Sequence, residues 1–375
     1  MTPCRRRVAL NRVDAFQTSP IPPHLREPVR AALRGEVAVW PSLSDDDVRL
    51  LVDHGVAPLV YAVQPLPELR RPAIRAAALE SLRADDLQGL LSALADRGLE
   101  VVITKGGALA YDVYAAPELR PRGDVDLLVS REHAAATIDA FRALGYEDRL
   151  TSGDEHAVRQ VTLSRVDAHG VRHDYDLHWD VANTPLFASA LRIDELATIP
   201  LPRLGPHARG LGYVDALLLA CIHRVAHHHD SDRLIWLVDI ALLRERMTPQ
   251  DHRRFWRLAA DARVVGVCTR SIALADEWTS RAPHDGAEHY LGAEELTREE
   301  PSRAFLDREI TYGGVMLANF RALSWRARAQ RAWQLAFPPA DFVRQSFGAQ
   351  NRLALPWLYL RRGVRGVARL FRRAM

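Results

Sequence analysis

Two aspartates separated by a single residue are the most chemically suggestive feature of this sequence. Asp124 and Asp126 begin the segment DVDLLV (124–129), whose composition predicts a short β-strand. Residues two apart on a strand point to the same face, so the two carboxylates should lie together, opposite a buried apolar face made by Val125, Leu127 and Val129. Ionised carboxylates repel one another unless a cation lies between them, and such oxygen-rich sites suit Mg²⁺ or Mn²⁺. The alternative is a solvated strand end with two exposed aspartates.

A second acidic segment follows about fifty residues later. The pattern of VRHDYDLHWDV (171–181) predicts another strand. One face would carry Asp174, Asp176 and His178, and the other would carry Tyr175, Leu177 and Trp179. If this strand pairs beside the Asp124 strand, Asp176 becomes a third carboxylate of the same site. Three carboxylates around two divalent ions can hold the attacking and leaving oxygens of phosphoryl or nucleotidyl transfer. The competing interpretation is an edge strand with one wet face.

Lysine occurs once among the 50 basic side chains, at Lys105, and the other 49 are arginine. Lys105 follows the β-branched run VVIT (101–104) and precedes Gly106 and Gly107. Lysine is a compact point charge on a thin stem, whereas arginine presents a planar fork. Because lysine persists at this one position of an arginine-rich chain, we infer that the position requires the slimmer ammonium group, for instance to contact a phosphate. Chance placement of a single lysine is the alternative.

Four histidines cluster in YVDALLLACIHRVAHHHD (213–230): His223, His227, His228 and His229. His223 and His227 are spaced to share one helical face, where they could bind a transition metal. The cluster could instead contact a substrate, or simply form a polar helix end. The neighbouring pair His229-Asp230 also invites comparison with His-Asp metal phosphohydrolases, although no suitably placed upstream histidine is obvious.

The elements that must position these residues alternate in type. Residues 1–98 read as an N-terminal helical region, with helical patterns in 48–63 and 72–98, the second ending at Gly98. Residues 99–205 alternate strand, helix, strand, helix and further strands, and residues 206–375 return to helices. We therefore expect an α+β fold, with a small mixed-sheet core between two helical regions.

Composition excludes several classes of protein. A hydrophobic content of 48% and a charged content of 26% are those of an ordinary globular protein, and the net charge of +3 does not indicate a nucleic-acid binder. Three scattered cysteines favour a reducing cytoplasm over a disulfide framework. The N-terminus lacks the apolar stretch of a secretory signal, and no apolar run is long enough to predict a transmembrane helix. The heavy use of Arg, Ala, Leu and Val suggests a GC-rich bacterial coding background.

The C-terminal segment PWLYLRRGVRGVARLFRRAM (356–375) is basic and amphipathic. Such a helix can contact an acidic partner or a membrane surface, or can pack its apolar stripe on the domain while its arginines face water. Gly363 and Gly366 weaken the helix prediction.

Four motifs together resemble the polymerase-β-like nucleotidyltransferase superfamily, and within it the family of uncharacterised bacterial nucleotidyltransferases. The motifs are Lys105-Gly106-Gly107-Ala108-Leu109, the run from Arg122 through Asp124 and Asp126 to Val129, Asp176-Leu177-His178-Trp179, and Trp236-Leu237-Val238-Asp239-Ile240. The resemblance spans roughly residues 40 to 250 and is most specific between 105 and 179.

The resemblance implies roles at the matching positions. Asp124, Asp126 and Asp176 would be the catalytic carboxylates and metal ligands, with Asp176 also a possible general base. Gly106 and Gly107 would let the backbone approach a triphosphate. Lys105 and Arg122 would neutralise its charge, with Arg120 a further candidate that could equally be a solvated loop residue. His178 and His223 complete the expected nucleotide-binding set. The chain departs from the pattern in one place, because many members have Gly-Ser where this chain has Gly106-Gly107, so Lys105 would replace the serine hydroxyl.

These features predict an Mg²⁺- or Mn²⁺-dependent transferase that moves a nucleoside monophosphate from a triphosphate, with ATP the expected nucleotide, to an acceptor nucleophile. The acceptor could be a small molecule, a sugar, a peptide or a protein. A catalytically weak nucleotide-binding accessory protein is the alternative from another class, and a His-Asp phosphohydrolase is the third.

Overall fold

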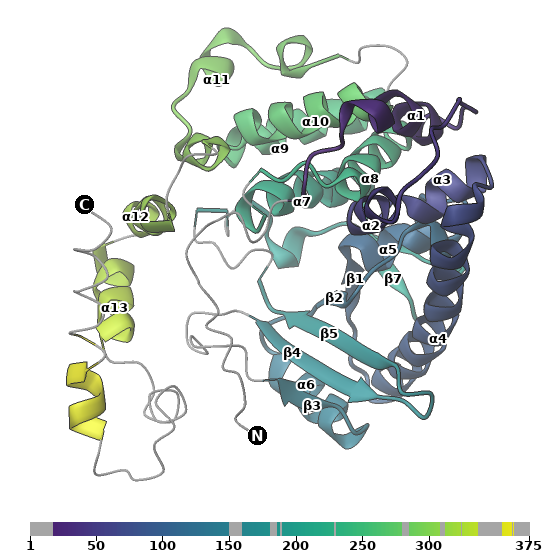
Figure 1. Ribbon diagram of the computed structural model, residues 1–375. Helices are drawn as coiled ribbons and strands as arrows, with labels where there is room; N and C mark the ends of the chain where they lie inside the picture. Colours follow the sequence, from purple (N-terminus) through teal and green to yellow (C-terminus); the bar gives the residue numbers. More distant parts are fainter. Residues whose placement is uncertain are drawn as a thin grey trace.

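Seven short strands form one mixed sheet in the described part of the chain (Figure 1). The computed structural model describes residues 18–149, 160–180, 186–187, 190–228, 230–279, 285–307, 312–323, 325–336, 355–361 and 363. The strands are β1 (Val102–Thr104), β2 (Val125–Leu128), β3 (Glu147–Arg149), β4 (Gln160–Val166), β5 (Arg172–His178), β6 (Thr198–Pro200) and β7 (Arg209–Leu211). Their order across the sheet is β3-β4-β5-β2-β1-β7-β6. Strand β2 runs parallel to β5 and antiparallel to β1, so the two acidic strands are neighbours.

The described helices are α1 (Pro23–Leu33), α2 (Asp45–Asp53), α3 (Ala57–Val63), α4 (Arg70–Ala95), α5 (Lys105–Asp112), α6 (Ala134–Ala143), α7 (Tyr213–Ala226), α8 (Leu234–Glu245), α9 (Pro249–Asp261), α10 (Val265–Thr279), α11 (Ala293–Thr297), α12 (Tyr312–Ala322) and α13 (Trp325–Ala336). Single 3-10 turns lie at Pro67–Leu69, Pro117–Leu119, Ile193–Glu195, Ala287–His289 and Pro301–Leu306. The predicted α+β class, with a mixed-sheet core and helical flanks, is confirmed. Among the described residues, no helix is both long and apolar enough to cross a bilayer.

One face of the sheet is buried under α4 and α6. Val125 and Leu127 of β2 and Leu177 of β5 are buried there against apolar side chains of α4 and α6. Alternation along the strands then sends Asp126 and Asp176 to the other face. Burial of the apolar residues of β2 and β5 on one face of the sheet therefore places the carboxylates on the opposite face.

The N-terminal and C-terminal helical regions share a single hydrophobic core, formed by α1–α3 with α7–α10. His54 joins them, because its Nδ1 accepts from the Leu234 amide (3.2 Å) and its carbonyl accepts from the Ile235 amide (3.1 Å) at the start of α8. Gly55 adopts φ +75°, and a Cβ there would lie 3.0 Å from the Cβ of Ile235. This tight contact ends α2, so the helical pattern predicted over 48–63 is two helices.

Some strands were not predicted from the sequence. β3, β6 and β7 have three residues each, too few to show an alternation. β7 pairs with β1 and follows residue 205, the predicted end of the core. β4 is one of the further strands that the sequence predicts within residues 99–205. The division at residues 98 and 205 remains a prediction.

A buried ion pair ties the loop before β2 to α8. The Nε and Nη2 atoms of Arg120 donate to the two carboxylate oxygens of Asp239 at 2.8 and 2.6 Å, and the Tyr114 hydroxyl donates to Asp239 at 2.7 Å. The two charged side chains are 7% and 6% exposed. Burial alone lowers the pKa of Arg120, but Asp239 outweighs it and the pKa lies above its ordinary value. Arg120 is therefore neither a solvated loop arginine nor a cation open to a phosphate.

Asp239→Ala should destabilise the protein strongly, because it leaves the Arg120 guanidinium buried without its counter-ion. Loss of one partner of a buried pair costs about 3–5 kcal/mol in the free energy of unfolding, measurable by urea titration. Arg142→Ala is the matched control, since Arg142 is 53% exposed and pairs with Asp139 and Asp148 on the surface. That variant should lose far less stability, because exposed ion pairs are screened by solvent. Equal losses would contradict the importance of the Arg120–Asp239 pair.

Candidate active site

The carboxylates meet where β2 and β5 run side by side. The parallel register pairs Asp126 with Asp176 and places His178 next to Leu128. Ligand atoms of Asp126, Asp176 and His178 all lie within 4.8 Å of one another, a spacing at which they could hold one metal ion. Asp124 precedes β2 and does not belong to this group. The structure therefore brings together two of the three predicted carboxylates, adds His178, and leaves the metal-binding role of Asp124 as a prediction.

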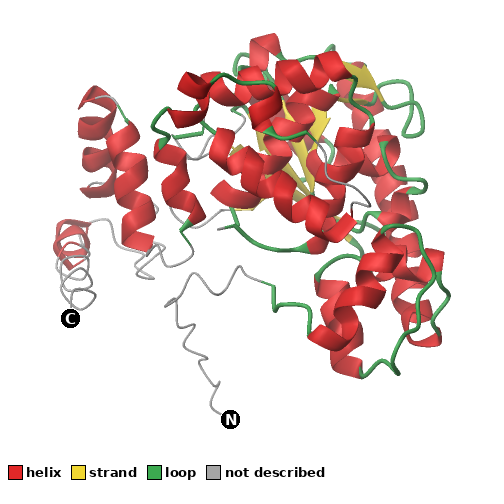
Figure 2. Cartoon of the chain, turned by 90° about the horizontal axis from the view of Figure 1, so that it is seen from above, coloured by secondary structure: helices red, strands yellow, loops and turns green. Residues whose placement is uncertain are grey.

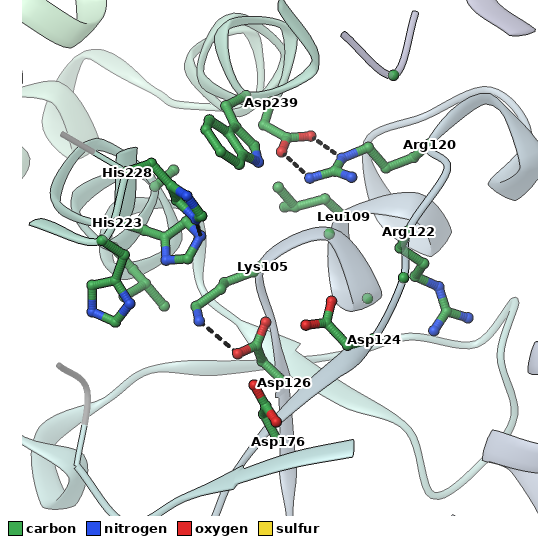
Figure 3. A pocket seen from close by; sticks show the side chains of 18 of the residues that line it. Lys105, Leu109, Arg120, Arg122, Asp124, Asp126, Asp176, His223, His228 and Asp239 are labelled. Carbon is green, nitrogen blue, oxygen red and sulfur yellow. Dashed lines mark hydrogen bonds and ion pairs between the residues drawn. The ribbon is translucent and has the colours of Figure 1, made fainter. Parts of the chain in front are cut away.

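Lys105 is the immediate partner of Asp126 (Figure 3). Its Nζ donates to Asp126 Oδ1 at 2.5 Å, and His178 Nε2 lies 2.8 Å from the same oxygen. Burial raises the pKa of Asp126, but Lys105 and His178 outweigh it and hold the pKa well below its usual range. Burial also raises the pKa of Asp124, and the charges of Asp126 and Asp176 raise it further, while Lys105 offsets part of the rise. Lys105 thus neutralises a site that carries an excess of negative charge.

The backbone at Lys105 is strained. Its φ of +53° lies in the left-handed region, which a lysine rarely adopts. Lys105 is the residue at which β1 ends and α5 begins, so the chain turns sharply there. Strain of this kind persists only where the surrounding structure over-determines it, and it clusters at functional sites.

Gly106 and Gly107 lie in the first turn of α5 and line the same cavity as the carboxylates. A Cβ on Gly106 would lie 2.7 Å from Cζ of Arg120, and one on Gly107 would lie 3.1 Å from Cγ2 of Ile103. A side chain at position 106 would therefore displace the paired Arg120 guanidinium, whereas one at position 107 would need a small shift of its neighbours. The Thr104 side chain does not cap the helix, so the N-terminal amides of α5 are suited to an anion, and triphosphate binding there stays a prediction.

The Arg122 guanidinium is held by Glu80 of α4. Its Nη2 and Nε donate to Glu80 of α4 at 2.8 and 3.2 Å, and the Tyr111 hydroxyl donates to Glu80 at 2.5 Å. The Arg122 side chain is 3% exposed, and Figure 3 shows it directed away from Asp126. Its Nη1 is buried without a hydrogen-bond partner. The predicted contact with nucleotide stays a prediction, whereas the arrangement gives Arg122 an evident part in anchoring the segment that leads to Asp124.

The hydroxyl of Thr162 on β4 supports the third carboxylate. Its Oγ1 donates to Asp176 Oδ1 at 2.6 Å, across the β4–β5 register. Behind the sheet, Asp86 of α4 accepts from the hydroxyls of Tyr175 (2.6 Å) and Tyr146 (2.7 Å). Tyr175 is the residue before Asp176, so this contact fixes the strand from its buried face. Sequence reasoning missed Thr162, whose signal would have been a hydroxyl residue opposite the acidic alternation.

Imidazoles form the wall of the cavity across from the carboxylates. His223 and His228 lie on the far side of Lys105 from Asp124 in Figure 3, with their Nε2 atoms 3.1 Å apart. Burial, and secondly the charge of Lys105, lowers the pKa of His223 well below its usual value and that of His227 to about 3. These two side chains are therefore neutral at ordinary pH. Within the described residues, no third ligand atom gathers with them into a metal site.

The suggested His-Asp pair has a different environment. His229 lies outside the described residues. Asp230 is 1% exposed and accepts from Arg224 Nη2 at 2.5 Å and from Arg270 Nε at 3.3 Å. A carboxylate enclosed by two arginines is poorly placed to bind a metal, so the geometry disfavours the phosphohydrolase interpretation.

Arg233 is a further cation that lines the cavity, and it was not predicted from the sequence. Its guanidinium carbon lies 5.2 Å from the ring centroid of Trp236, and its Nε is buried without a hydrogen-bond partner. Burial, and then the charge of Arg120, lowers the pKa of Arg233. Among the described cavity residues, Arg120, Arg122 and Lys105 each have a carboxylate in direct contact, and Arg233 has none. Arg233 is thus the cavity cation best suited to an incoming anion.

The carboxylates, Lys105, the imidazoles and Arg233 line one cavity of about 580 Å³ between the sheet and helices α7 and α8. That volume falls within the usual range for small-molecule sites, about 300–1,000 Å³. The cavity contains carboxylates and Lys105, α5 amides, neutral imidazoles, and the Arg233–Trp236 pair. Every predicted site residue lines it: Lys105, Gly106, Gly107, Arg122, Asp124, Asp126, Asp176, His178 and His223.

Residues 44–280 match the model of a protein family described as uncharacterised nucleotidyltransferases. The chain belongs to this family. The match includes every cavity residue and ends just after α10. Membership supports transfer of phosphorus-containing groups, consistent with the predicted superfamily, and leaves metal, nucleotide and acceptor open. No curated protein matches the chain.

The buried imidazoles should make the stability of this nucleotidyltransferase depend on pH. In the unfolded chain His227 takes up a proton near pH 6.5, whereas in the fold it does so near pH 3. Between pH 6.5 and about 3 the unfolded chain binds a proton at His227 that the folded chain does not bind. The free energy of unfolding therefore falls as pH falls through this range, and His227 has no such effect above pH 6.5. His227→Gln should flatten the free energy of unfolding between pH 6.5 and about 4, as measured by urea titration.

His207→Gln is the matched control for His227, since His207 is exposed. Its pH profile should follow that of the wild type. An equal flattening in both variants would show that the slope does not come from the buried imidazoles.

Lys105 and a divalent ion should be alternative partners for Asp126. Lys105→Ala removes a counter-ion that is 15% exposed, so we expect a loss of about 3 kcal/mol in the absence of divalent ions. Added Mn²⁺ should then raise the melting temperature of Lys105→Ala more than that of the wild type, because the ion takes over the neutralisation. Lys105→Arg keeps the charge but would hold Asp126 through two atoms, so its Mn²⁺ shift should be smaller than that of the wild type. Equal Mn²⁺ shifts in the wild type and Lys105→Ala would contradict this exchange.

Proposed function

We propose that this nucleotidyltransferase transfers a nucleoside monophosphate from an Mg²⁺- or Mn²⁺-bound triphosphate, with ATP the expected nucleotide, to an acceptor nucleophile. The observation that carries the proposal is the parallel register of β2 and β5, which sets Asp126 beside Asp176 in a cavity that also holds Lys105 and His178. Family membership makes nucleotidyl transfer the reaction class to test first.

The donor set fits a hard divalent cation. Carboxylate oxygens of Asp126 and Asp176 are the ligands that Mg²⁺ and Mn²⁺ prefer. His178 touches Asp126 and would orient it, while Asp124, the third predicted ligand, lines the same cavity. When bound, such ions polarise the phosphate and stabilise the charge that develops on its oxygens.

The cations and amides around this centre would hold the triphosphate. With Asp126 holding a metal ion, the Lys105 ammonium would be available to contact phosphates near the N-terminus of α5. Arg233, which lies beside Trp236 in the same cavity, would bind a further negatively charged group. In the reaction an acceptor oxygen or nitrogen attacks the α-phosphorus, the bond to the β-phosphate bridging oxygen breaks, and pyrophosphate leaves. Asp176 would take the acceptor proton.

The neutral imidazoles suit the acceptor better than the phosphates. His223 and His227 carry no charge at ordinary pH, so they would hydrogen-bond hydroxyl or amino groups rather than attract anions. This wall would accordingly face the acceptor, and the role predicted for His223 shifts from nucleotide to acceptor.

Asp126→Asn and Asp176→Asn should each abolish transfer, because each removes a charge on which metal binding rests. We expect two rates to fall by about 10²–10³-fold or more, with Mn²⁺ and a cell extract as the source of acceptor: release of labelled pyrophosphate from γ-labelled triphosphates, and incorporation of label from α-labelled triphosphates into the acceptor. Asp174→Asn is the matched control on the same strand, since the half-buried Asp174 pairs with Ser164 and Arg172 and does not line the cavity. It should retain wild-type activity.

The same assay separates the competing functions. Tight binding of triphosphate without pyrophosphate release in the wild type would favour the catalytically weak accessory protein. Activity that survives loss of Asp126 and Asp176 would refute the proposed site.

A further inference from the structure

Charge is divided unevenly along the chain. Residues 310–375 contain 12 arginines and one acidic residue, Asp341, so this segment carries a net charge of +11. Residues 1–309 contain the remaining 38 basic and 46 acidic residues, a net charge of −8, and the two parts account for the +3 of the whole chain. The modest overall charge therefore conceals an acidic body and a strongly basic C-terminal segment.

The same segment carries the exposed tryptophans. Trp325, Trp333 and Trp357 are 72%, 66% and 62% exposed, and Leu317 and Leu360 are also exposed. Every tryptophan of the described body is buried or half-buried: Trp40, Trp179, Trp236, Trp256 and Trp278. Folding hides this residue type everywhere except where arginine is most concentrated, so the exposure is a property of the segment.

These residues lie on α12, α13 and the helical residues 355–361, which we call the C-terminal arm. Figures 1 and 2 both show α13 set apart from the sheet and from helices α7–α10. Arg328 ties α13 to α12, donating from Nε to the carbonyl of Phe320 (3.1 Å) and from Nη2 to that of Arg321 (2.5 Å). The family match ends at residue 280, so the arm is additional to the region that contains the cavity.

We propose that the C-terminal arm docks on the surface of an anionic lipid bilayer. Tryptophan prefers the boundary between lipid headgroups and acyl chains, and arginine binds lipid phosphates. On residues 355–361, Trp357, Leu360 and Arg361 are spaced to share one side of the helix and are exposed together. A helix that joins apolar anchors to basic groups in this way lies in the plane of the interface.

The composition of the arm distinguishes a bilayer from other anionic partners. Single-stranded nucleic acid would use the arginines and flat aromatic rings, but aliphatic side chains such as Leu317 and Leu360 gain little from bases. Acyl chains accept tryptophan and leucine alike. The acidic body is repelled by the same surface, so the arm alone would face the lipid and the body would remain in water.

Vesicle sedimentation with the full-length protein tests the proposal. We expect binding to vesicles of 70% phosphatidylcholine and 30% phosphatidylglycerol, weak binding to pure phosphatidylcholine, and release by high salt. The triple variant Trp325→Ser/Trp333→Ser/Trp357→Ser should reduce the partition coefficient by at least about tenfold. Arg321→Gln/Arg326→Gln should reduce it about thirtyfold, from roughly 1 kcal/mol for each arginine at an anionic surface.

Val37→Ser/Val39→Ser/Ile74→Ser is the matched control, because it removes exposed apolar side chains from the body. It should bind vesicles like the wild type, and circular dichroism should show that all variants fold. Absence of vesicle binding, or binding that the arm variants leave unchanged, would overturn the proposal. So would displacement from vesicles by single-stranded RNA that binds more tightly, or a dimer that the tryptophan variant dissociates in the absence of lipid.

Discussion

The parallel pairing of β2 with β5 is the constraint on which the rest of the site depends. It forces two carboxylates, Asp126 and Asp176, side by side on a face that burial makes poorly solvating. Burial raises the pKa of the neighbouring Asp124, and the charges of Asp126 and Asp176 raise it further, so the site needs a cation. The strained turn at Lys105 provides that cation, and the α5 amides and the neutral imidazoles surround it. Much of the local structure follows from placing one ammonium group beside Asp126.

Buried ion pairs hold this centre in place from both sides. Arg120–Asp239 joins the loop before β2 to α8, while Arg122–Glu80 joins the same loop to α4. Such pairs stabilise a fold little compared with apolar residues of similar size, but they fix orientation because each partner is costly to leave alone. Asp124 and Asp126 follow the loop directly, so their position is set by two helices distant in the sequence. Gly106 belongs to the same arrangement, since only glycine leaves room for Arg120.

The sequence predicted what depends on short-range pattern. Period-two alternation identified β2 and β5, assigned Asp176 and His178 to one face of β5, and Gly98 marked the end of α4. Partners distant in the chain could not be predicted, because nothing near Arg120 signals Asp239, 119 residues away. The three-residue strands β3, β6 and β7 were missed for the same reason, since tertiary pairing alone defines them. His178 lies beside the carboxylates because of the register in which β2 and β5 pair, and neither strand's own sequence reveals that register.

The single lysine illustrates how composition and geometry support one another. Within the cavity, the arginines at 120 and 122 are rigid forks matched to one carboxylate each, and they serve as fixed ties. Lys105 occupies a narrower place between Asp126 and the imidazole wall, where its charge acts on both: it lowers the pKa of Asp126 on one side and of His223 on the other. A planar guanidinium would be broader and would bind the carboxylate in two places, holding it more firmly. A compact ammonium on a flexible stem can leave Asp126 when a metal ion arrives, so a site that must exchange one cation for another has a physical reason to keep lysine.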